Sequence, residues 1–228
     1  MQAIILAAGK GTRMNCEEQN SKPKVMYPLN RIPMIKYCVD NLRRVGINNI
    51  TLVIGYKKEQ VWDYFENSVK YAIQEEQLGT GHAVMMAKSL LDVSDGILVC
   101  CGDMPLFKLE TIKHLIEVYQ SQKPAIALLS AIFADPFGYG RIVRSSTSEV
   151  SSIVEQKDCS PKQQGIKECN TGFYIFNGEW LKHNLFRLQT NNSQKEYYLT
   201  DLVELAVQQK QKVIAVPVAD ESEALGIN

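Results

Sequence analysis

Several features are missing from this sequence of 228 residues, and each absence excludes a class of protein. The 25 Lys and Arg residues balance the 25 Asp and Glu residues, so the chain lacks the basic excess of a nucleic-acid-binding protein. No apolar run approaches the roughly 18 residues of a membrane span. The chain passes from Met1 straight into an apolar run, without a basic and apolar leader. We therefore expect a cytoplasmic protein that binds neither nucleic acid nor a membrane.

The six cysteines form no CxxC pair and have no His spacing suited to zinc. Cys100 and Cys101 lie in an apolar strand pattern, where a free cysteine is usually a small buried hydrophobe. In a reducing cytosol we expect free thiols rather than disulfides or metal ligands. Hydrophobic residues make up 45% of the chain, which is enough for one α/β domain.

What the sequence does contain is an alternation of apolar runs and amphipathic stretches over roughly the first 130 residues. The apolar runs predict strands at 3–6, 49–55, 70–74, 96–103 and 124–131. The amphipathic stretches predict helices at 34–46, 57–68, 81–91 and 108–120. This βαβα order predicts an α/β fold with a doubly wound, mostly parallel, Rossmann-like sheet.

The pattern changes after about residue 135. Shorter strands, a polar loop at 157–168, two helices near 178–187 and 197–209, and a last strand at 212–218 are expected there. We therefore predict one domain over 1–228 with two halves that share a core. Residues from about 1 to 135 form the nucleotide-binding half, and residues from about 136 to 228 form a small mixed-sheet lobe.

The first loop, "LAAGKGTRM" at 6–14, directly follows a strand. Its small residues let backbone N–H groups approach phosphate oxygens, and Lys10 and Arg13 add positive charge. It matches neither GxxxxGK[ST] nor GxGxxG, so a plain strand-to-helix turn is the alternative. Lys22 and Lys24, in "SKPKV" at 21–25, supply a second cationic cluster or merely a solvated loop.

The segment "QEEQLGTGHA" at 74–83 turns through glycines into a helix, so its N–H groups can face an anion. Gln74 and Gln77 each offer a donor and an acceptor, which suits the edge of a base. His82 begins an apolar helix, and we expect a structural role for it.

Asp103 lies at the carboxyl end of the strand in "CCGDMPL" (100–106). In open α/β sheets ligands bind beyond the carboxyl ends of the strands. A carboxylate there can hold a divalent cation against substrate phosphates, whereas a lone Asp would equally suit a turn or helix cap.

These four motifs, in this order, resemble the sugar-1-phosphate nucleotidyltransferases, which have the nucleotide-diphospho-sugar transferase fold. Within that family the chain is most similar to the uridylyltransferase (pyrophosphorylase) domains of bifunctional N-acetylglucosamine-1-phosphate uridylyltransferases. The resemblance continues through "GYGRIVR" (138–144), "IVEQKD" (153–158), "NTGFYIF" (170–176), "EYYLTDLVELA" (196–206) and "EALGIN" (223–228). It covers essentially the whole chain.

The resemblance implies roles for individual residues. Arg13 and Lys24 would act on the substrate phosphates, and Asp103 with Asn228 would hold Mg²⁺ as the cofactor. The nucleotide would contact Leu6, Ala7, Ala8, Gly9, Gln74, Gln77, Gly79, Thr80, Cys101 and Gly102. The sugar would contact Gly140, Glu155 and Asn170.

The chain departs from the family pattern at three places. The segment from Arg13 to Lys24 is longer by about four residues, so either Lys22 or Lys24 could reach the phosphates. Cys101 stands where the family has Tyr. The hexapeptide repeats of the family's left-handed β-helix do not occur before Asn228, so we expect no acetylation of glucosamine-1-phosphate.

The implied reaction converts UTP and N-acetylglucosamine-1-phosphate into UDP-N-acetylglucosamine, a cell wall precursor, and pyrophosphate. One alternative is a nucleotidyltransferase for another sugar phosphate or another nucleotide. A second is a catalytically silent, nucleotide-sugar-binding regulatory subunit, which the retained Asp103, Lys24 and Arg13 disfavour.

Overall fold

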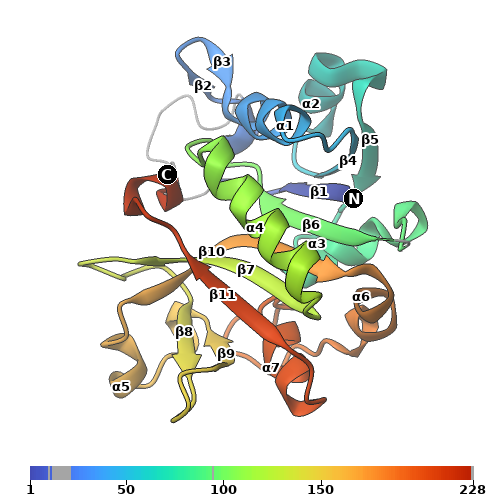
Figure 1. The fold of residues 1–228 in the computed structure, drawn as a ribbon. Helices are drawn as coiled ribbons and strands as arrows, with labels where there is room; N and C mark the ends of the chain where they lie inside the picture. Colours follow the sequence, from blue (N-terminus) through green and yellow to red (C-terminus); the bar gives the residue numbers. More distant parts are fainter. Residues whose placement is uncertain (10, 12–21, 94, 227–228) are drawn as a thin grey trace.

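The computed structural model describes residues 1–9, 11, 22–93 and 95–226. Its centre is a nine-stranded sheet in which seven strands follow the order β11-β7-β10-β6-β1-β4-β5 (Figure 1). These strands are β1 (Gln2–Ala7), β4 (Asn49–Ile54), β5 (Lys70–Ile73), β6 (Gly96–Cys101), β7 (Ile126–Ile132), β10 (Glu168–Asn177) and β11 (Val213–Pro217). The predicted α/β fold with a mainly parallel sheet is confirmed.

Strands β5, β4, β1 and β6 are parallel neighbours. Leu6 in β1 pairs with Val53 on one side and with Cys101 on the other, so both strands reach the same edge of the sheet as β1. The loops that follow β1 and β6 therefore leave the sheet side by side. This register places Asp103 next to the start of the first loop.

The sheet is covered on both faces because its strands are apolar on both sides. On one face Ile5, Leu52 and Leu98 belong to a buried cluster with Ile35 and Val39 of α1. On the other face the cluster contains residues of α3 and α7, and it is equally buried. The helices are α1 (Met34–Arg44), α2 (Lys58–Phe65), α3 (Thr80–Met86), α4 (Leu109–Gln122), α5 (Pro161–Gln164), α6 (Gly178–Asn184) and α7 (Asp201–Gln208).

Strand β10 comes from the second half of the sequence but lies between β6 and β7, antiparallel to both. Its pairing with β7 shifts register between Asn170 and Tyr174. Gly172 lies within this irregularity with φ at 74°, a conformation that L side chains rarely adopt. Gly172 lies beside Cys101 at the carboxyl end of β6.

A hairpin of β8 (Arg141–Arg144) and β9 (Val150–Val154) is attached to β10 through the pair Cys169 and Arg141. A smaller hairpin, β2 (Pro28–Leu29) and β3 (Ile32–Pro33), precedes α1. The predicted loop at 157–168 is partly wrong, because Ser160 closes a capping box that begins α5. Within the described residues, no helix has the length and apolarity needed to cross a membrane.

Candidate active site

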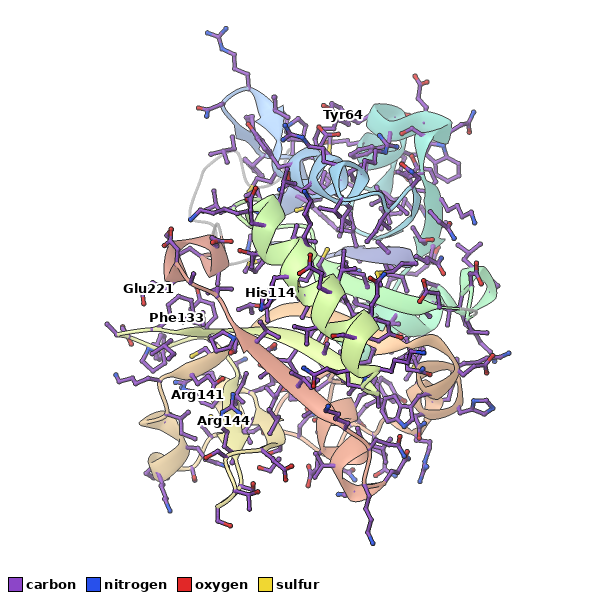
Figure 2. All side chains as sticks on the ribbon, in the orientation of Figure 1. Tyr64, His114, Phe133, Arg141, Arg144 and Glu221 are labelled. Carbon is purple, nitrogen blue, oxygen red and sulfur yellow. The ribbon has the colours of Figure 1, made fainter. Side chains whose placement is uncertain are left out.

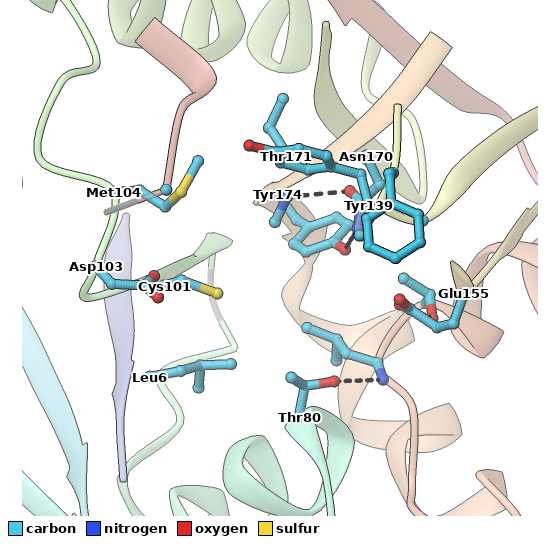
Figure 3. Close-up of a pocket in the computed structure, with 17 residues that line it drawn as sticks. Leu6, Thr80, Cys101, Asp103, Met104, Tyr139, Glu155, Asn170, Thr171 and Tyr174 are labelled. Carbon is cyan, nitrogen blue, oxygen red and sulfur yellow. Dashed lines mark hydrogen bonds between the residues drawn. The ribbon is translucent and has the colours of Figure 1, made fainter. Parts of the chain in front are cut away.

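A cavity of about 390 Å³ opens at the carboxyl ends of β1 and β6 and faces the β8–β9 hairpin and β10. In Figure 3, Leu6, Cys101 and Asp103 face Tyr139, Glu155 and Asn170 across it. Seven of the residues assigned to the site by resemblance line this cavity: Leu6, Thr80, Cys101, Asp103, Gly140, Glu155 and Asn170.

The wall on the β1–β6 side is fixed by the parallel register. The Gly102 N–H donates to the Leu6 carbonyl at 2.9 Å, which extends the pairing beyond the end of β6. Ala7 and Ala8 are buried, and Gly9 is exposed. The first loop thus leaves the core at Gly9, next to the cavity.

Asp103 and Lys24 form an ion pair at the cavity. The Lys24 ammonium lies 2.7 Å from Oδ2 of Asp103, and their side chains are 11% and 27% exposed. Lys22 is exposed, whereas Lys24 begins a short 3₁₀ helix (Lys24–Met26). Of the two lysines, Lys24 therefore contacts the carboxylate on this wall. The other proposed cation, Arg13, lies outside the described residues.

The loop before α3 is held by the side chain of Gln74, which is only 3% exposed. Its Nε2 donates to the Gly79 carbonyl at 3.1 Å and lies 3.0 Å from Nδ1 of His82. Gln77 hydrogen-bonds to carbonyls of the same loop. Gln74, Gln77 and Gly79 thus shape the loop that presents Thr80 to the cavity, and none of the three lines the cavity itself.

Residues 197–200 run beside this loop instead of forming the predicted first turn of a helix, so the prediction that the helix begins near 197 is wrong. The Gly81 N–H donates to the Tyr197 carbonyl at 2.7 Å, and the Leu199 N–H donates to Oγ1 of Thr80 at 3.0 Å. In a helix that began at Tyr197, the Tyr197 carbonyl would accept from the Asp201 N–H, but here the Gly81 N–H donates to it and the Asp201 N–H donates to the Tyr198 carbonyl. Leu199 and Thr200 consequently line the cavity.

The opposite wall is a hydrogen-bonded polar surface. The Asn170 N–H donates to the Gly140 carbonyl at 2.8 Å, and Nδ2 of Asn170 donates to the Tyr174 hydroxyl at 2.6 Å. Oε1 of Glu155 accepts from the Thr200 hydroxyl at 3.0 Å. Burial raises the pKa of the Glu155 carboxyl, and the Thr200 bond opposes that shift. The wall offers amide, hydroxyl and carboxyl groups, which suit a hydroxyl-rich ligand.

Ten lining residues carry no predicted role, and most of them lie around the β10 kink, in the loop before β8 or in the segment 197–200. These residues are Met104, Phe137, Gly138, Tyr139, Thr171, Gly172, Tyr174, Leu199, Thr200 and Gly226. The only sequence signal for most of them was membership of the quoted motifs.

The cavity has one carboxylate suited to a divalent cation on its β1–β6 wall. Asp103 borders the cavity at the β1–β6 wall, and the described part of the chain contains no cluster of three His, Cys, Asp or Glu residues. A single carboxylate fits a hard cation such as Mg²⁺, which keeps several waters and takes its other ligands from substrate phosphates. Asn228, the other proposed ligand, lies outside the described residues.

Gly79 supports a prediction about stability. Its φ is 105°, and an added Cβ would lie 2.6 Å from the Tyr197 carbonyl oxygen. A Gly79→Ala variant should lose about 1–3 kcal/mol through backbone strain, plus the cost of displacing Tyr197, measured by denaturant unfolding. Gly46→Ala is the matched control, because Gly46 has φ at 89° with no atom near the added Cβ. Equal losses in the two variants would contradict a special role for the contact between Gly79 and Tyr197.

Asp201, at the start of α7, supports a pH prediction. Burial, and then the charge of Glu155, raise the pKa of its carboxyl to about 6. Because the folded pKa exceeds the unfolded one, this group stabilises the fold at low pH and loses that contribution as the pH rises through about 6. Asp201→Asn should therefore melt above the wild type at about pH 8 and close to it at about pH 4. The control is Glu117→Gln in α4, an exposed carboxylate that does not contribute to the Asp201 shift, and it should show no such pH-dependent gain. An Asp201→Asn variant that melts below the wild type at about pH 8 would refute the assignment.

The chain was compared with known proteins. The profile of the Nucleotidyl transferase family matches residues 2–221. Proteins named "Bifunctional protein GlmU" from Geotalea uraniireducens and Clostridium novyi are 43% and 45% identical to it over 100% and 99% of the chain. The chain spans about half the length of these curated relatives, 50% and 49%.

The fold also matches a solved structure. A protein described as a glucose-1-phosphate thymidylyltransferase from Bacillus anthracis superposes with a TM-score of 0.80, at 21% identity. The match covers 96% of this chain and 87% of the other chain. At this identity the likeness supports the fold alone.

Proposed function

The chain belongs to the Nucleotidyl transferase family, and from this premise we propose that it converts UTP and N-acetylglucosamine-1-phosphate into UDP-N-acetylglucosamine and pyrophosphate. One observation carries the proposal: a single cavity has on one wall Asp103, which is paired with Lys24, and on the other wall a surface of amide, hydroxyl and carboxyl groups. The first wall suits a triphosphate, and the second suits a sugar. The 43% identity to proteins of the GlmU type supports this choice of substrates.

In the proposed reaction a phosphate oxygen of the sugar phosphate attacks the α-phosphorus of UTP, and pyrophosphate leaves from the opposite side. Both reactants are anions, so the protein must neutralise charge and align them. Lys24 would hold the phosphates, with Arg13 beside it, and Asp103 and Asn228 would hold Mg²⁺. When bound, Mg²⁺ supplies charge stabilisation on the phosphoryl oxygens. The attacking group belongs to the sugar phosphate, so no side chain is needed as a nucleophile.

The remaining proposed contacts are assigned to the nucleotide and to the sugar. The nucleotide would contact Leu6, Ala7, Ala8, Gly9, Gln74, Gln77, Gly79, Thr80, Cys101 and Gly102, with Gln74, Gly79 and Thr80 on its uridine portion and Gln77 nearby. The sugar would meet Gly140, Glu155 and Asn170. Since UTP is an intracellular metabolite, we place the reaction in the cytoplasm.

The test is pyrophosphate release, measured with Mg²⁺ across a panel of nucleoside triphosphates and sugar-1-phosphates. The proposal predicts the highest kcat/KM for UTP with N-acetylglucosamine-1-phosphate. A preference for another pair would assign a different nucleotidyltransferase activity. Release with no pair would indicate a binding subunit and would overturn the proposal.

A further inference from the structure

Arg141 is the largest of the fully buried side chains, with 1% of its surface exposed. Among the described residues no carboxylate forms an ion pair with it. Its guanidinium donates from Nη1 to the Tyr139 carbonyl and from Nη2 to Oε1 of Gln156 at 2.7 Å, while Nε has no partner. A buried charge without a counter-charge is costly, so the site retains Arg141 at the expense of stability.

Arg144, three residues further along β8, shows the ordinary alternative (Figure 2). Its Nε lies 2.6 Å from Oε2 of Glu168, and a second nitrogen contacts the same carboxylate. Arg144 is an exposed residue, whereas Arg141 is enclosed. The two arginines of β8 therefore differ in their hydrogen-bond partners. Arg144 donates to a carboxylate, whereas Arg141 donates to a peptide carbonyl and to a side-chain amide oxygen.

The carbonyl that Arg141 holds belongs to the peptide between Tyr139 and Gly140. A trans peptide is planar, and its C=O and N–H point in opposite directions. With the carbonyl drawn toward the buried guanidinium, the Gly140 N–H is directed the other way, and Gly140 lines the cavity. A charge-assisted bond to the carbonyl also polarises the peptide, which makes its N–H a stronger donor.

The second bond of Arg141 fixes the rest of this wall. Oε1 of Gln156 also accepts from the Gly138 N–H at 3.1 Å, and Gln156 directly follows Glu155. One guanidinium thus anchors Gly138, the Tyr139–Gly140 peptide and the chain beside Glu155. A carboxylate partner for Arg141 would divert its charge from the peptide.

We propose that Arg141 is a positioning residue for the sugar. It orients and polarises the Tyr139–Gly140 peptide so that the Gly140 N–H donates a hydrogen bond to an oxygen attached to the sugar ring. This inference rests on the proposed function. Arg141 is buried in β8 and does not line the cavity, yet it would selectively affect the binding of the sugar phosphate.

The test is steady-state kinetics of Arg141→Met and Arg141→Lys, with Arg144→Met as the matched control. Loss of a charge-assisted hydrogen bond corresponds to about a 10- to 100-fold change. Arg141→Met should therefore raise the KM for N-acetylglucosamine-1-phosphate by about that factor, with the KM for UTP within about twofold of the wild type. Arg141→Lys, which keeps the charge but not the fork, should restore part of the loss. Arg144→Met should change neither KM.

Deoxy analogues of the sugar phosphate separate this role from a purely structural one, because a structural defect would raise the KM equally for every analogue. The penalty of Arg141→Met should persist with most singly deoxygenated analogues and disappear with the one that lacks the oxygen met by the Gly140 N–H. If Arg141→Met does not fold, Gln156→Met decides the matter, because it removes the acceptor shared by Arg141 and Gly138. That variant should also raise the KM for the sugar phosphate alone.

Several outcomes would overturn the inference. These are an equal rise of both KM values, an unchanged KM for the sugar phosphate, or a penalty that is the same for every analogue. Each of them, found alongside normal wild-type turnover, overturns the role of Arg141 and leaves the proposed function intact. Absence of wild-type turnover with every sugar phosphate would overturn the proposed function and this inference with it.

Discussion

An Asp103→Asn variant should lose about a hundredfold or more of its turnover while remaining folded. The change keeps the shape of the side chain but removes the negative charge that would hold Mg²⁺ at the cavity. Asp103 lies beyond the end of β6, and its contact with Lys24 is partly solvated, so the fold does not depend on the charge. The measurement is pyrophosphate release at saturating substrates, with circular dichroism to confirm folding.

The matched control is Asp40→Asn. Asp40 is paired with Lys36 within α1, so it also loses an Asp–Lys contact when substituted, but it does not line the cavity. This variant should keep wild-type turnover. Near-normal turnover of Asp103→Asn under saturating Mg²⁺ would exclude Asp103 as a metal ligand.

The second large effect concerns the two lysines after the first loop. Lys24→Ala should lower turnover by about a hundredfold or more, because it removes a cation from the wall where the phosphates would lie. Lys22→Ala should change turnover by less than about twofold, since its side chain is exposed and solvated. Both variants remove one positive charge within the same short segment, so net charge cannot explain a difference between them.

Turnover of Lys22→Ala and Lys24→Ala is measured under identical conditions, together with the KM for UTP. The reverse order of effects would mean that Lys22 serves the phosphates in the substrate complex. Equal, small effects would remove this segment from the catalytic machinery.

Much of the fold could be predicted from the sequence, because local pattern determines it. The apolar runs that became β1, β4, β6 and β7 are buried on both faces, and such strands require helices on both sides. Gly46, predicted to end the first helix, has φ at 89° just beyond α1. These predictions needed no knowledge of distant contacts.

The position of β10 could not be predicted in the same way. Its residues show an apolar strand pattern, but which strands it joins depends on non-local pairs, such as Phe173 with Cys100 in β6 and Tyr174 with Leu128 in β7. The position of β10 between β6 and β7 places Gly172 beside Cys101. A Cβ added to Gly172 would lie 3.2 Å from the Cys101 sulfur. The part of the cavity formed by Tyr174 and Thr171 exists only because of that pairing.

Asp103 could be predicted from its position, because it is a polar residue at the carboxyl end of a strand. The other site residues were predicted through the resemblance to the family. Leu199 and Thr200 were not predicted as site residues because residues 197–200 hydrogen-bond to Thr80 and Gly81 at the start of α3, which are distant in sequence. The place of Arg141 was equally hidden, since an arginine on a short strand normally indicates a solvent-facing side chain. Its burial depends on the loops around Tyr139 and Gln156.

In the proposed reaction one cavity holds both substrates, and the uridylyl group passes directly between them. The most direct measurement is ³¹P nuclear magnetic resonance of the protein with UTP and Mg²⁺, before and after addition of N-acetylglucosamine-1-phosphate. Direct transfer should give no pyrophosphate before the addition, and UDP-N-acetylglucosamine and pyrophosphate in equal amounts afterwards. Pyrophosphate formed from UTP alone, or no diphosphate sugar after the addition, would contradict it.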